Sequence, residues 1–232
     1  MDPRHLFVDQ RLTGMCVYCG AEPQTRDHVP SRVLLDEPYP LNLPVVDACE
    51  DCNSSFSQHE QYVACLIECA LTGSSEPAGA QRAKIRRVLE ENPSLRHRLF
   101  LSREIDDDGN ITWLAEVDRV KTVLLKLARG HAAYELGLPQ LDGPRDVAFT
   151  PFAVMSDQER DVFECFPQRS LIRWPEVGSR AFIRAVRSAP SDSVNGWLTV
   201  QSGRYRYKVE QTDGLVVQIV LSEYLACRIV WD

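Results

Sequence analysis

Apolar positions follow the helical repeat in three stretches of the chain. In residues 80–103 the repeat continues until Pro93, which interrupts a helix because proline lacks a backbone N–H. A second apolar stripe runs from Val120 to Leu136, and Gly137 is a natural C-terminal stop. A third helix is expected to begin at Asn53 and to continue through Leu71.

The last part of the chain shows short apolar runs separated by turn residues, a pattern typical of β-strands. Four such runs, with turns such as Gln201-Ser202-Gly203 between them, predict an antiparallel meander over residues 197–200, 205–209, 215–221 and 225–231. In the second run, basic and apolar residues alternate, which predicts one basic and one apolar strand face: Arg204, Arg206 and Lys208 against Tyr205, Tyr207 and Val209.

Turn residues divide the chain into three regions. Residues 101–117 predict a hairpin that turns at Asp107-Asp108-Gly109-Asn110, and the Gly- and Ser-rich segment 73–79 is the best boundary candidate. We therefore expect an α+β protein with an N-terminal module, a helical middle with a basic segment and hairpin, and a C-terminal antiparallel β-rich region of unknown role. The expected bounds are 1–75, 76–140 and 141–232.

Composition places the chain among ordinary globular proteins. Hydrophobic residues make up 44% and charged residues 25% of the 232 residues, which excludes disordered, collagen-like and coiled-coil classes. No apolar run approaches the roughly 20 residues that span a bilayer, and the N-terminus lacks the pattern of a signal peptide. We therefore expect a soluble, cytoplasmic protein with reduced thiols and no membrane partner.

The net charge of −7 is unevenly distributed. Residues 1–70 contain 4 Lys and Arg against 11 Asp and Glu, whereas the remaining residues contain equal numbers of the two signs. The total argues mildly against a nucleic-acid partner, because such proteins usually carry a basic surface. Two basic stretches, 82–103 and 169–187, nevertheless offer local phosphate contacts.

The eight cysteines include two CxxC pairs. Cys16 and Cys19 form the first pair, and Cys49 and Cys52 form the second after 29 intervening residues. Two such pairs can present four thiolates to one ion, which predicts a tetrahedral Cys₄ zinc site. A closed site of this kind has no open coordination position, so we expect a structural zinc. We expect the remaining cysteines to be buried thiols: Cys65, Cys69, Cys165 and Cys227.

The segment between the two pairs carries candidate catalytic residues. Asp27 and His28 stand side by side, and in a strand their side chains would point to opposite faces. Asn42 follows in the Leu41-Asn42-Leu43-Pro44 run, and Asn53 comes directly after the second CxxC pair. Phosphodiester hydrolysis needs a base for the water and a cation beside the developing charge.

The motifs CVYC, RDHVP, LNLPV and CEDCN, in this order, resemble the HNH (ββα-metal) endonuclease family, in the subgroup with two CxxC pairs. The resemblance covers roughly residues 14–70. It implies a zinc-pinned ββα finger and a metal-dependent endonuclease that hydrolyses phosphodiester bonds in DNA. One departure is that many members have a Lys shortly after the final Asn, whereas Asn53 is followed by Ser54-Ser55-Phe56.

The resemblance assigns a role to each candidate. His28 is expected to be the general base, because a neutral imidazole is available near pH 7. Asn42 would brace the loop that carries it. Asp27 and Asn53 would hold one catalytic Mg²⁺ or Mn²⁺, which prefer oxygen ligands. Glu60, two helical turns beyond Asn53, is expected to brace the site rather than ligate the ion.

Basic residues outside the finger are expected to contact nucleic acid. The candidates lie at the start of the most basic stretch and are Arg82, Lys84, Arg86 and Arg87. A solvated helix face is the equally weighted alternative. Lys121, Lys126 and Arg129 could extend a basic surface, although a plain exposed helix face is commoner.

Two other functional classes stay open at this point. The finger could be a catalytically silent zinc scaffold that binds DNA or a protein partner. The chain could also be a nuclease effector within an anti-phage defence complex, in which an ATPase partner licenses cleavage; this reading follows fold-level analogy alone.

Overall fold

The first elements form a hairpin joined to a long helix. A computed structural model describes residues 14–165, 175, 177, 179–187, 193–211 and 214–232. Strand β1 (Thr25–His28) pairs antiparallel with β2 (Val45–Ala48). Helix α1 (Glu50–Thr72) follows at once; Cys49 caps its N-terminus, and Gly73, with φ of 70°, ends it. The helix expected from Asn53 to Leu71 is therefore confirmed in substance.

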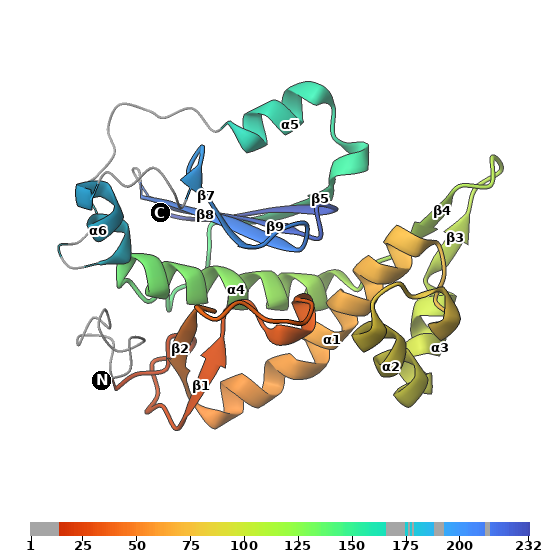
Figure 1. The fold of residues 1–232 in the computed structure, drawn as a ribbon, viewed down its shortest axis with the longest axis horizontal. Helices are drawn as coiled ribbons and strands as arrows, with labels where there is room; N and C mark the ends of the chain where they lie inside the picture. Colours follow the sequence, from red (N-terminus) through yellow and green to blue (C-terminus); the bar gives the residue numbers. More distant parts are fainter. Residues whose placement is uncertain (1–13, 166–174, 176, 178, 188–192, 212–213) are drawn as a thin grey trace.

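The middle of the chain contains two short helices and a projecting hairpin (Figure 1). Pro93 separates the helices as expected, and it also begins the second one, because the first helical position needs no N–H donor. The expected hairpin is confirmed. The elements are α2 (Ala83–Glu91), α3 (Pro93–Leu101), β3 (Arg103–Ile105) and β4 (Ile111–Trp113).

Helix α4 (Val117–Leu136) runs through the centre of the molecule, between the N-terminal elements and the C-terminal sheet (Figure 1). Buried residues lie on both of its sides, including charged ones. Gly130 permits a close approach to the segment after β1, because a Cβ at this position would lie 2.6 Å from a methyl group of Val29. The position of α4 therefore couples the N-terminal hairpin to the rest of the fold.

The C-terminal region is a six-stranded antiparallel sheet with the order β5-β10-β9-β8-β7-β6. Its central four strands are the expected meander, which is confirmed; β5 and β6 extend the two edges. The bounds are β5 (Asp146–Pro151), β6 (Ser193–Val194), β7 (Trp197–Gln201), β8 (Tyr205–Gln211), β9 (Leu215–Leu221) and β10 (Leu225–Trp231).

Both faces of this sheet are covered (Figure 1). Helix α4 packs on one face and α5 (Asp157–Glu164) lies over the other, where Phe152, Phe163 and Trp197 form a second apolar cluster. Helix α6 (Arg180–Arg187) lies near the end of α4. Every residue of β9 is buried, as expected for a strand covered on both faces.

The expected basic face of β8 is neutralised rather than open. Arg206 forms two hydrogen bonds, of 2.7 and 2.6 Å, with the carboxylate of Glu164 on α5. Lys208 is buried and its ammonium lies 2.7 Å from Glu210. Arg206 therefore ties β8 to α5, and Lys208 is paired within its own strand.

One hydrophobic cluster extends from Cys16 to Trp231, so the three expected regions share a core. The protein is accordingly a mixed α+β fold with a cysteine cluster near its N-terminus. Among the helices of the described residues, none is both long and apolar enough to cross a membrane.

Candidate functional site

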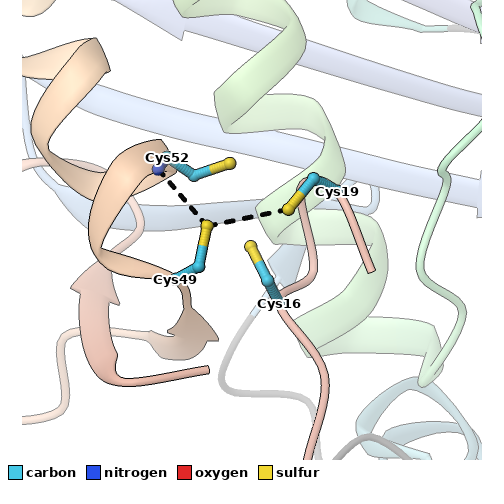
Figure 2. Close-up of side chains that lie close together, drawn as sticks. All are labelled: Cys16, Cys19, Cys49 and Cys52. Atoms are coloured by element: carbon cyan, nitrogen blue, oxygen red, sulfur yellow. Dashed lines mark hydrogen bonds between the residues drawn. The ribbon is translucent and has the colours of Figure 1, made fainter. Parts of the chain in front are cut away.

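The four cysteines of the two CxxC pairs come together at one point (Figure 2). Their sulfur atoms all lie within 4.8 Å of one another, and the Sγ atoms of Cys19 and Cys49 are 3.6 Å apart. Tetrahedral zinc with Zn–S bonds of about 2.3 Å places its sulfurs about 3.8 Å apart. The expected Cys₄ cluster is therefore present, with spacing that suits a zinc ion.

Local structure explains how the cysteines converge. Cys16 and Cys19 flank a turn that lies before β1. This turn continues into Gly20, which has a φ of 79°. Cys49 and Cys52 belong to the first turn of α1, where the amide of Cys52 donates to Cys49 Sγ at 3.4 Å and lowers the pKa of that thiol. The cluster thus ties the start of α1 to the loop before β1.

The remaining cysteines are mostly core residues. Cys65, Cys69 and Cys227 are buried, as expected, and burial raises the pKa of Cys65 and Cys69 to about 12. Cys165 is exposed, so the expectation of burial was wrong for this residue. It lies just after the last turn of α5, and the residue of α5 that packs against the sheet is Phe163.

His28 ends β1 and is half-buried. Burial lowers the pKa of this imidazole below its usual value of 6.5. The positive charges of Arg32 and Lys126 lower the pKa further, while Asp27 opposes them. A hydrogen bond to the backbone of Pro44 also opposes the lowering of the pKa. The lowered pKa favours the neutral imidazole, which is the form that can accept a proton.

Two arginines near His28 are not among the site residues that the sequence predicts. Arg26 precedes His28 by two positions, so both side chains point to the same face of β1, and its guanidinium lies 3.6 Å from Asp47. Arg32 follows β1 in a short 3₁₀ turn and is exposed. The alternation of side chains along a strand is the sequence signal that places Arg26 on the same face as His28. No such signal exists for Arg32, because its position depends on the turn that follows β1.

Asp27 faces the interior, opposite to His28. Its carboxylate accepts a hydrogen bond of 2.6 Å from the Tyr18 hydroxyl and lies 2.7 Å from the ammonium of Lys126 on α4. Glu60, on α1, pairs with the same ammonium at 2.5 Å. Lys126 is only 2% exposed, so the expected basic surface does not include it.

The two asparagines have different surroundings. The side-chain amide of Asn53 donates to Thr25 Oγ1 at 3.1 Å and thereby ties the first turn of α1 to β1. Asn42 lies exposed in the turn before β2. Asn53 and Asp27 therefore do not form an open ligand set for Mg²⁺ or Mn²⁺, because the carboxylate of Asp27 is buried against an ammonium group.

Some of the residues expected to contact nucleic acid instead make contacts within the protein. Arg82 is buried; it donates to Asp36 at 2.7 Å and to two backbone carbonyls, so it is removed from the predicted set. Lys84 donates to the carbonyl of Arg32 at 3.0 Å. Arg86 and Arg87 are exposed. Arg169 and Arg173 of the second basic stretch lie outside the described residues.

Comparison with family models, curated proteins and solved structures finds no match to this chain.

Proposed function

We propose that residues 14–72 form a zinc-pinned endonuclease module of the HNH type, in which His28 activates water for attack on a phosphodiester bond of DNA. The observation that carries this proposal is an imidazole at the end of β1 whose pKa is lowered by burial and by the charge of Arg32, with Arg26 on the same strand face. The order of hairpin, helix and Cys₄ cluster also agrees with the arrangement that the sequence resemblance implies.

The chemistry needs a base and a positively charged surface. A half-buried, neutral imidazole can take the proton of the attacking water, and positioned general bases accelerate reactions by about 10²–10⁴-fold. Arg26 and Arg32 would neutralise the phosphate and the charge that develops on it. No catalytic step is assigned to Mg²⁺ or Mn²⁺, because the expected ligands do not form an open site.

One observation favours a second function, a catalytically silent zinc scaffold that binds DNA or a protein. Asp27, the residue expected to hold the catalytic ion, is instead paired with Lys126. A scaffold would retain the Cys₄ cluster and its basic residues and would need no base. The two functions therefore differ in turnover but agree on zinc content.

A plasmid assay separates the two. Zinc-loaded protein is incubated with supercoiled DNA in the presence of Mg²⁺, Mn²⁺ or EDTA, and binding is followed in parallel by gel shift. The nuclease proposal expects nicked or linear products; a gel shift without any product would favour the scaffold. Strong cleavage by the isolated chain would also contradict a requirement for an ATPase partner.

A further inference from the structure

The strongest unexplained feature of the fold is a buried cluster of charges between α1, α4 and the end of β1. Three oxygen atoms converge on the ammonium of Lys126: Asp27 Oδ2 at 2.7 Å, Glu60 Oε1 at 2.5 Å and Ser31 Oγ at 2.8 Å. Lysine has three N–H donors, so each can be directed at one of these oxygens.

The cluster is shielded from solvent. The side chain of Lys126 is 1% exposed, and those of Asp27 and Glu60 are each 8% exposed. The Tyr18 hydroxyl donates to Asp27, and the Ser31 hydroxyl donates to Glu60. Every member is thus satisfied by another side chain, which is what a buried ionic group requires.

The oxygen set resembles that of a divalent-ion site, but its centre is already occupied by nitrogen. Two carboxylates and a hydroxyl are the hard ligands that Mg²⁺ and Mn²⁺ prefer. Mg²⁺, however, usually keeps several waters and sits about 2.0–2.1 Å from its ligands. While Lys126 is in place, its ammonium, on a side chain that is only 1% exposed, occupies the position between the carboxylates that a hydrated ion would need.

We propose that Lys126 is a built-in cation that takes the place of a divalent ion at Asp27 and Glu60. Lys126 acts as a positioning residue: it holds Asp27, and through the backbone of β1 it orients His28 on the opposite face. Asp27 consequently serves the fold and the placement of His28, not metal ligation. The functional meaning rests on the proposed nuclease function, whereas the test below reads metal binding instead of cleavage.

The test compares the effect of Mn²⁺ on thermal stability in zinc-loaded proteins. In Lys126→Met the two carboxylates lose their cation, so the variant melts at a lower temperature and added Mn²⁺ restores several degrees of that loss. The wild type and the control Lys121→Met, an exposed residue on the same helix, show no such shift. Asp27→Asn in the Lys126→Met background removes the Mn²⁺ effect.

Two results overturn the proposal: an equal Mn²⁺ shift in the wild type, or none in folded Lys126→Met. If that variant does not fold, amine acetylation of the wild type with mass spectrometry gives the answer instead. Lys126 stays unmodified with and without Mn²⁺ while Lys121 reacts; acetylation of Lys126 that appears only with Mn²⁺ means that the ion displaces the ammonium, which contradicts the proposal. Loss of cleavage in any variant bears on the nuclease proposal alone.

Discussion

At the scale of single residues, the alternation of side chains along β1 separates two kinds of chemistry. Arg26 and His28 point to one face, and Thr25 and Asp27 point to the other. The inward face receives Lys126 and becomes a satisfied ionic cluster. The outward face carries His28, whose pKa is lowered by burial and by the charges of Arg32 and Lys126, and Arg26 shares this face. Adjacent residues in the sequence therefore serve structure and proposed catalysis respectively.

The protonation of His28 is expected to follow its surroundings. Because burial and the charges of Arg32 and Lys126 lower its folded-state pKa, the folded protein binds this proton more weakly than the unfolded chain does. The stability that neutral His28 contributes is therefore present above the unfolded pKa of about 6.5 and is lost as pH falls through the lower folded value.

NMR titration of the imidazole tests this expectation. The midpoint of His28 should lie below 6.5 in the wild type and move upward in Arg32→Gln, while Arg87→Gln, a distant exposed arginine, leaves it unchanged. A wild-type midpoint at or above 6.5 contradicts the described environment.

At the scale of elements, the Cys₄ cluster fixes the loop before β1 onto the first turn of α1. The hairpin is only four residues per strand, and an isolated hairpin is at best marginally stable in water. A metal ion that cross-links the loop before β1 to the first turn of α1 stabilises the folded state, because its ligands are separate in the unfolded chain and are joined in the native state.

Cys16→Ser is therefore expected to lose zinc and stability together, with the melting temperature falling by about 5 °C or more. Zinc content by atomic emission and melting by circular dichroism measure the two effects. Cys65→Ser is the matched control: it alters a buried thiol of α1 outside the cluster, so it should retain zinc even where it lowers stability. Full zinc content in Cys16→Ser would contradict a four-cysteine site.

At the scale of the whole molecule, the features that the sequence predicts are those set by a few neighbouring residues, and the features that it does not predict join residues far apart in the chain. The CxxC pairs, the Asp107–Asn110 turn and the Gly137 stop are short motifs with fixed local geometry, and each lies where it was expected. The pairing of Lys126 with Asp27 spans nearly a hundred residues and depends on how α4 packs, so sequence spacing carries no trace of it.

The same reason accounts for the basic residues. The sequence predicts surface charges at Arg82, Lys126, Arg206 and Lys208, because charged residues are seldom buried unless they are paired. Three of them instead meet a carboxylate from elsewhere in the fold, such as Glu164 on α5 for Arg206, and Lys208 meets Glu210 on its own strand. The net acidity of the first 70 residues is thus partly balanced from outside: Lys126 and Arg82 meet acids of this segment.

The central claim is that His28 is the base of a nuclease site, and single-turnover cleavage of plasmid DNA by His28→Ala tests it most directly. The variant is compared with the wild type and with His97→Ala, which replaces an exposed histidine on α3, after zinc content and circular dichroism show all three proteins intact. We expect a loss of about 100-fold or more for His28→Ala alone. Cleavage by His28→Ala at the wild-type rate would contradict it.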